Sequence, residues 1–408
     1  MLRYMTAGES HGPGLTAIIE GLPSGLEVSR HFINEELSRR QMGVGRGGRM
    51  KIEKDEIEII AGVRAGKTLG SPISFLIKNR DWENWLEVMS SEETERKPEK
   101  ITKPRPGHAD LAGIFKMNFD DIRNVLERAS ARETAARVAV GAFAKLLLNE
   151  LDIKILSHVV RIGSCSTSLK VSPKPSELSK IDLSPVRCFD KKAETEMLKE
   201  IEAASLAKDS LGGIFEVLVY GCPPGLGSYI SWDRRLDGRL SRAIVSIPAI
   251  KGVEFGEGFK ISGLYGSKAH DEIFYDGSKG FYRKTNRAGG LEGGMTNGEP
   301  ILIRAAMKPI PTLSKPLKTV DIVTKKLVSA LKERADVCAV PAAAVVGEAV
   351  TAFEIANALI EKFGGDSILE LKRNYEGYLK QIADACPPLA GQIADSKKRV
   401  RSGLRIKE

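Results

Sequence analysis

The stretch Ser130–Asn149, SARETAARVAVGAFAKLLLN, is the clearest structural signal in this chain. Its small and apolar residues recur at the spacing of one helix face: Ala135, Val138, Ala139, Ala142, Phe143 and Leu146. Ser130 and Glu133 fit a capping box, in which each side chain bonds the backbone of the other residue. The stretch therefore predicts a long helix that starts at Ser130.

Strands and helices are mixed on both sides of this helix. The pattern predicts helices at Ser29–Gln41 and near 319–332, 347–363 and 366–382, with Gly364 and Asp366 as caps. It predicts strands within residues 3–20, 50–79, 214–220 and 300–307, and a surface excursion over 170–206. No regular strand–helix–strand rhythm appears, which favours an α+β fold over a doubly wound parallel sheet.

Composition places the chain among ordinary globular proteins. It has 408 residues, of which 42% are hydrophobic and 28% charged. The five cysteines are scattered and form no CxxC pair, which argues against disulfides and a metal site and favours a reducing compartment. The N-terminus has no apolar signal-peptide core, and we expect no apolar run long enough to span a bilayer. We therefore expect a cytoplasmic protein.

Basic residues exceed acidic ones and give a net charge of +9. Nearly half of this excess lies between Asp395 and Glu408, where six basic residues accompany two acidic ones. We expect residues 388–408 to be a poorly ordered basic tail that follows one domain, 1–387. A nucleic-acid-binding protein would show basic residues interleaved with aromatic ones, but aromatic residues make up only 6% of the chain.

Two histidines lie in glycine-containing turns. His11 stands in GESHG (8–12), and His108 stands in RPGHAD (105–110), two residues before Asp110. A histidine in such a turn is accessible and suits proton transfer, and a nearby carboxylate can orient it. Taken alone, each motif also has a plain alternative without a catalytic role: a turn histidine for GESHG, and a surface His–Asp pair for RPGHAD.

An arginine-rich loop follows the predicted helix Ser29–Gln41. RRQMGVGRGGRM (39–50) carries four arginines and four glycines, which suits a loop that wraps an anion; a flexible basic loop is the alternative. Its glycines match G-x-G-x-x-G, but no strand precedes them and no helix follows, so we reject a dinucleotide fingerprint. The segment 62–68 resembles a phosphate-binding loop but is one residue short, which argues against a phosphotransferase.

Three further segments suit ligand binding. Arg128 and Arg132 flank the start of the long helix, where free N–H groups favour anions. The glycines of GGLEGGMTNGEPI (289–301) suit backbone that lies against a planar ligand, and KPIPT (308–312) follows. Arg334 and Asp336 open RADVCAVPAA (334–343). A capped helix, an ordinary loop and a structural ion pair are the plain alternatives.

Taken together, these motifs resemble the chorismate synthase family. GESHG, RRQMGVGRGGRM, RPGHAD, RASARETAARVAVG (128–141), GGLEGGMTNGEPI, KPIPT and RADVCAVPAA appear in that family's order across nearly the whole chain. The resemblance implies a single-domain β-α-β sandwich with antiparallel sheets, a homotetramer, and conversion of 5-enolpyruvylshikimate 3-phosphate to chorismate with reduced FMN. Either NADPH or an external flavin reductase is expected to supply the electrons.

The resemblance also implies roles for individual residues. His11 would donate a proton to the leaving phosphate, His108 would maintain the protonation state of the flavin, and Asp336 would relay a proton. Ser10 and Ser130 would position these groups. Substrate anions, or NADPH, would contact Arg40, Arg46, Arg49 and Arg132. The expected FMN contacts are Arg128, Ala129, Ser130, Ala249, Gly293, Lys308, Pro309, Ile310, Pro311, Thr312 and Arg334.

Overall fold

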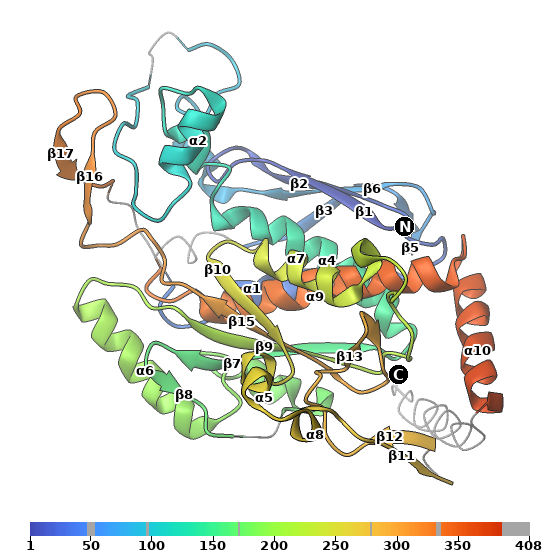
Figure 1. The fold of residues 1–408 in the computed structure, drawn as a ribbon. Coiled ribbons are helices and arrows are strands. Elements are labelled where there is room, and N and C mark those ends of the chain that lie inside the picture. Colours follow the sequence, from blue (N-terminus) through green and yellow to red (C-terminus); the bar gives the residue numbers. More distant parts are fainter. Residues whose placement is uncertain (47–53, 95–97, 170–171, 278–279, 332–335, 386–408) are drawn as a thin grey trace.

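Two antiparallel sheets enclose a layer of helices in the computed structural model, which describes residues 1–46, 54–94, 98–169, 172–277, 280–331 and 336–385 (Figure 1). The first sheet has the order β1-β2-β6-β3, with bounds Arg3–Ala7, Gly14–Glu20, Ile73–Lys78 and Ile57–Ala61. The second has the order β10-β15-β9-β7-β8, with bounds Ile250–Phe255, Ile301–Met307, Gly213–Tyr220, Lys154–Ile162 and Cys165–Ser166. The predicted α+β sandwich is confirmed.

The helical layer consists of α1 (Arg30–Gln41), α4 (Thr134–Asn149), α7 (Leu236–Val245) and α9 (Val340–Phe363). α4 contacts β1 and β2 of the first sheet, whereas α9 contacts β7 and β9 of the second. The other helices are α2 (Asp110–Met117), α3 (Arg123–Leu126), α5 (Leu178–Asp182), α6 (Lys191–Leu206), α8 (Gly266–Ala269) and α10 (Ile368–Ala385). Four two-stranded ribbons complete the strands: β4–β5 (Val63–Arg64, Lys67–Thr68), β11–β12 (Ile273–Asp276, Gly280–Arg283), β13–β14 (Leu291–Glu292, Met295–Thr296) and β16–β17 (Lys318–Val320, Leu327–Ser329).

α9 is the most buried of the long helices. Within the described part of the chain it alone is apolar and long enough to cross a membrane, yet 94% of its most apolar window is buried inside the protein. The expectation that no apolar run reaches this length is therefore wrong. α9 is predominantly apolar and packs against α1, α4, α7, β7 and β9, as expected of a central core helix.

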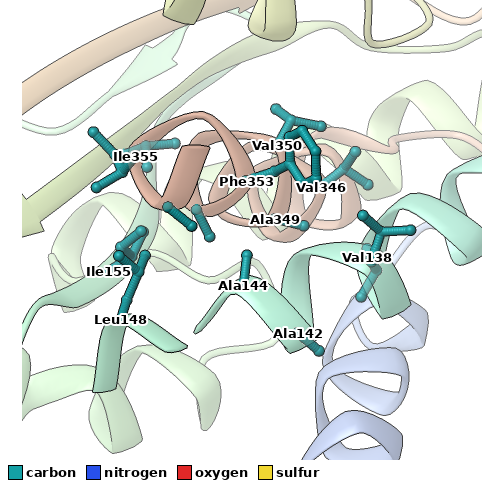
Figure 2. Packing of buried hydrophobic residues seen from close by; sticks show 14 of the residues in the cluster. Val138, Ala142, Ala144, Leu148, Ile155, Val346, Ala349, Val350, Phe353 and Ile355 are labelled. Carbon is teal, nitrogen blue, oxygen red and sulfur yellow. The ribbon is translucent and has the colours of Figure 1, made fainter. Parts of the chain in front are cut away.

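The crossing of α4 and α9 brings two backbones unusually close. Figure 2 shows Ala144 of α4 directed toward α9, and Ala349 on the side of α9 that faces α4. At this crossing a Cβ atom added to Gly141 would lie 2.4 Å from the Cα and Cβ of Ala349. Only glycine at position 141 therefore permits this helix separation.

A buried ion cluster joins the helices to the second sheet. The carboxylate of Glu348 on α9 accepts hydrogen bonds from Arg39 on α1 (2.8 and 2.9 Å), Lys145 on α4 (2.5 Å) and Ser157 on β7 (2.6 Å). Arg187 adds a fourth donor at 3.2 Å. Glu36 and Asp182 bond the same cations, so three carboxylates balance three cations.

Several predicted elements need correction. Residues 318–329 form the hairpin β16–β17, not a helix, because the Asp321 carboxylate accepts the backbone N–H groups of Val323 and Thr324 and closes a turn. The excursion 170–206 contains α5 and α6, and the inward residues of α6 are Ala193, Met197, Ile201 and Ala204. Its many lysines and glutamates conceal this helical spacing.

The predicted helix ends are partly right. Gly364 ends α9, as expected, and α1 begins just after Ser29, the predicted first residue, whose side chain caps the helix. Ser130 accepts from the backbone N–H of Arg132 at the start of a 3-10 turn, and Glu133 bonds Arg137, so the predicted capping box does not form. At α10 the side chain of Ser367, rather than that of Asp366, accepts from the helix backbone. The tail 388–408 lies outside the described residues.

The α4–α9 crossing gives a first prediction. Gly141→Ala should lower the free energy of unfolding by about 1–3 kcal/mol, because the new methyl group forces the two helices apart. Gly377→Ala on α10 is the matched control: nothing lies within 4 Å of its added Cβ, and it should raise stability by roughly 0.5–1 kcal/mol. Urea denaturation measures both, and a Gly141→Ala variant as stable as wild type would contradict the close packing.

The ion cluster gives a second prediction. Burial alone would raise the pKa of Glu348, but Arg39, Lys145 and Arg187 hold the pKa of this carboxyl well below its ordinary value of 4.5. Glu348→Gln leaves three buried cations with two carboxylates. It should lower the free energy of unfolding by about 3–5 kcal/mol at neutral pH.

The sign of the pH dependence follows from the same pKa. A carboxyl whose pKa is lower in the folded state contributes stability fully above its unfolded pKa and loses that contribution as the pH falls toward the folded pKa. The stability difference between wild type and Glu348→Gln should therefore shrink as the pH falls below about 4.5. Urea midpoints measured between pH 7 and pH 3 test this, and a constant difference would refute it.

Candidate active site

A cavity of about 780 Å³ opens where several chain turns and helix ends meet. It lies beside the N-terminal turns of α4 and α9 and the C-terminal end of α1, and loops and the end of β15 complete its walls. Its charged and histidine side chains are His11, Arg40, Arg46, Asp81, Arg105, His108, Arg132, Lys308 and Asp336. Its volume is within the range typical of small-molecule sites.

Most of the residues singled out from the sequence line this one cavity. They are Ser10, His11, Arg40, Arg46, His108, Ala129, Ser130, Arg132, Ala249, Lys308, Ile310, Pro311, Thr312 and Asp336. Pro309 and Gly293 do not line it, and Gly293 lies in the turn between β13 and β14. Arg49 and Arg334 lie outside the described residues.

Arg128 is also outside the cavity lining. Its guanidinium donates to the backbone oxygen atoms of Thr6 (2.8 Å) and Gly8 (3.0 Å). These bonds join the segment that precedes α4 to the end of β1 and the residue after it. Arg128 therefore fixes the turn that carries His11.

His11 is held by a carboxylate on one edge and an aromatic ring on its face. Its Nδ1 lies 2.9 Å from Oε1 of the buried Glu127, and its backbone N–H donates to Oε2 of the same residue. The Trp85 ring stacks on the imidazole with centroids 4.0 Å apart. Because a carboxylate accepts from Nδ1–H, this arrangement assigns proton exchange with a ligand to Nε2.

His108 is held by a different arrangement. Its Nδ1 lies 2.5 Å from Oδ1 of Asp110, and Arg105 donates to both oxygens of the same carboxylate. Burial raises the pKa of Asp110, but the hydrogen bonds from His108 and Arg105 outweigh burial and hold this pKa well below 3.8. Arg105 also donates to Thr312 Oγ1 at 3.2 Å, which connects the His108 turn to the segment after β15.

Arg40 and Arg132 share one buried carboxylate. Oδ2 of Asp55 accepts from Arg40 Nη1 (3.3 Å), and Oδ1 accepts from Arg132 Nη1 (2.5 Å). Burial lowers the pKa of Arg40 to about 10, with Arg132 and Arg46 acting in the same direction and Asp55 opposing them. Arg40 thus remains charged at neutral pH.

Arg46 and Asp336 form an ion pair in the cavity wall, with Nε and Oδ2 3.3 Å apart. The loop that carries Arg46 is fixed because the Gly45 carbonyl accepts from the N–H of Val337 at 2.6 Å. Ser130 and Ser10 face each other, with 3.1 Å between their hydroxyl oxygens. Both pairs join segments that are far apart in the sequence.

Lys308 and Ala249 shape the side of the cavity next to the second sheet. The ammonium of Lys308 donates to the Gly107 carbonyl at 2.5 Å, and burial, together with Lys251, lowers the pKa of Lys308. Ala249 adopts the left-handed conformation at φ 69°, and its carbonyl accepts the N–H of Lys308. This strained residue directs the backbone around the cavity rim.

The cavity combines an apolar wall with excess positive charge. Its apolar lining includes Ala129, Ile247, Pro248, Met307, Ile310, Pro311, Ala339, Ala342, Ala343 and Val346. Five cationic side chains face only two acidic ones among the lining residues. Such a site suits a planar apolar ring together with several oxyanions.

The structure also argues against a phosphate-binding loop at 62–68 and against a dinucleotide fingerprint in the arginine-rich loop. Residues 63–68 form the β4–β5 hairpin rather than a loop before a helix, and none of them lines the cavity. The glycines of the arginine-rich loop follow a helix, α1, instead of a strand, although Gly47 and Gly48 lie outside the described residues. Neither segment has the context of a nucleotide-binding motif.

Sequence reasoning missed four residues that organise the site: Asp55, Trp85, Glu127, and Asp81, whose carboxylate accepts from the indole N–H of Trp85 at 3.0 Å. Glu127 directly precedes the Arg128–Ser130 motif, so its position was a usable signal. Asp55 and Trp85 lie in segments with no motif, and only the tertiary fold brings them to the histidine and the arginines. Arg39, by contrast, belongs to the buried ion cluster and not to the cavity.

Comparisons with known proteins agree with this geometry. The family model described as chorismate synthase matches residues 2–360. Proteins named chorismate synthase from Desulforamulus reducens and Carboxydothermus hydrogenoformans are each 56% identical, and each match covers 94% of this chain and 100% of the relative. A crystal structure of chorismate synthase superposes with a TM-score of 0.76 at 45% identity, covering 94% of this chain and 98% of that one. The chain therefore belongs to the chorismate synthase family and is a carbon–oxygen lyase.

Proposed function

We propose that this chain eliminates phosphate and a ring proton from 5-enolpyruvylshikimate 3-phosphate to form chorismate, and that it requires reduced FMN. The observation that carries the proposal is the convergence of five cationic side chains and two carboxylate-held histidines on one apolar-walled cavity. The substrate has a phosphate and two carboxylates, so its binding requires several fixed cations. Family membership supports the same reaction.

The residues present fit reduced FMN. The apolar wall offers a surface for a flat ring system, and Lys308 and the arginines offer partners for its negative charge. We assign its contacts to Ala129, Ser130, Ala249, Lys308, Ile310, Pro311 and Thr312. When bound, reduced FMN would supply electron density for cleavage of the carbon–oxygen bond.

We assign His11 the role of proton donor to the leaving phosphate. Glu127 holds Nδ1, so the donated proton resides on Nε2. The carboxylate of Glu127 stabilises the charged imidazolium, and the Trp85 ring fixes the plane of the imidazole. Ser10 and Ser130 support the same turn through their mutual hydrogen bond.

We assign roles in proton transfer to His108, which lies near Lys308, and to Asp336, which is paired with Arg46. The Asp110 carboxylate is shared with Arg105, so it orients His108 while part of its charge is neutralised. Asp336 is held by Arg46 and serves as the proton relay. Arg40, Arg46 and Arg132 bind substrate anions, a role that we favour over NADPH binding because the loop lacks a dinucleotide fold.

The resemblance supports several further proposals. They are a homotetramer, a cytoplasmic location, one catalytic domain over 1–387, and reduction of FMN either by NADPH on this protein or by an external flavin reductase. We also propose, on the same ground, that FMN contacts Arg128, Gly293, Pro309 and Arg334. The substrate is proposed to contact Arg49.

A third prediction tests the proposed function directly. Under anaerobic conditions with chemically reduced FMN, wild type should release phosphate from 5-enolpyruvylshikimate 3-phosphate and form chorismate, measured by absorbance. His11→Ala and His108→Ala should each reduce turnover by ~10²–10⁴-fold, because each removes a positioned proton-transfer group.

Both variants should keep the wild-type fold, measured by circular dichroism, because neither histidine is part of the hydrophobic core. Exposed His31→Ala is the control and should turn over normally. Near-normal phosphate release by either active-site variant would remove the role assigned to that histidine, and inactive wild type would refute the function.

A further inference from the structure

Asp55 is a carboxylate buried between two cavity arginines, and no ligand role accounts for it. Its side chain is fully buried, and it does not line the cavity. Its backbone N–H donates to Gln41 Oε1 at 3.2 Å, which fixes it beside the end of α1. A buried charge is costly unless it is paired, so the two arginines and Asp55 depend on one another.

Each oxygen of Asp55 accepts from a different guanidinium, as described above. Three further nitrogens are also directed: Arg40 donates from Nε to Thr134 Oγ1 (2.9 Å) and from Nη2 to the Ala131 carbonyl (3.1 Å), and Arg132 donates from Nε to Asn79 Oδ1 (2.9 Å). Two like charges are thereby kept adjacent and in fixed orientations.

Asn79 connects this pair to the His11 turn. Its amide nitrogen donates to the carbonyls of Glu9 (3.0 Å) and Gly12 (2.7 Å) on either side of His11, while its oxygen accepts from Arg132. The arginine pair and the proton donor thus share one rigid frame. An anion placed on the arginines has a set position relative to His11.

We propose that Asp55 is a positioning residue that holds Arg40 and Arg132 as a matched pair for one oxyanion of the substrate. This inference rests on the proposed function for the identity of the substrate, but not for the binding of an anion. A residue that only neutralised charge would have the opposite effect, because its removal would strengthen anion binding. The sign of the change therefore separates the two roles.

The test uses Asp55→Asn in the full-length protein. The amide keeps one acceptor but turns an NH₂ group toward the second guanidinium, so the pair loses its alignment. We expect KM for 5-enolpyruvylshikimate 3-phosphate and the dissociation constant of inorganic phosphate, measured by calorimetry, to rise about tenfold or more, with a smaller change in kcat.

Glu56→Gln is the matched control, because it removes the same charge from the neighbouring, exposed residue and should change neither constant. Asp55→Glu keeps the charge but lengthens the side chain. It should also raise both constants, which keeps the proposal testable if Asp55→Asn does not fold.

Several results would overturn the proposal. They are tighter or unchanged phosphate binding by folded Asp55→Asn, a fall in kcat with KM unchanged, and no binding of millimolar phosphate by wild type. Phosphate binding requires no turnover, so its response to Asp55→Asn remains decisive even if wild type proves inactive on the proposed substrate.

Discussion

Glu348 is a buried carboxylate on the central helix, and it bonds α1, α4, β7 and the segment before α6 at once. Hydrophobic packing alone would let these elements slide, because apolar contacts have little directionality. The six-charge cluster of Glu36, Arg39, Lys145, Asp182, Arg187 and Glu348 gives the helical layer one fixed register. α9 reaches the cavity with its first turns, so the register also sets the position of Ala342, Ala343 and Val346 in the cavity wall.

The ion cluster and the cavity share the end of α1. Arg39 and Arg40 are adjacent, but Arg39 enters the buried cluster and Arg40 faces the cavity. A helix directs successive side chains about 100° apart, so anchoring Arg39 also aims Arg40. Asp55 then pairs Arg40 with Arg132, and Asn79 joins Arg132 to the His11 turn. Scaffold and site are thus linked through two adjacent arginines of one helix.

The sequence predicted features that depend on neighbouring residues better than features that depend on residues far apart in the chain. Helix α4, the β1–β2 turn and strands β9 and β15 were predicted because their local spacing is decisive. Family motifs pointed to most of the cavity-lining residues. The hairpin at 318–329 was wrongly predicted as a helix because Asp321 imposes a turn, and α6 was missed because charge masks its inward face. Asp55, Trp85 and Glu127 required the fold, since their partners are distant in sequence.

The position of α9 near the end of the chain has a consequence for folding. During synthesis, α4 and the first sheet emerge long before α9. Until α9 is made, the apolar face of α4 has no helix to pack against, and Arg39 and Lys145 lack the carboxylate of Glu348. Contacts between such distant segments carry a large loop-closure cost and slow folding. A nascent chain that ends before residue 340 lacks the helix that fills its centre and exposes a surface prone to aggregation. The helix that completes the core of the finished protein thus leaves the unfinished polypeptide with apolar surface that nothing yet covers.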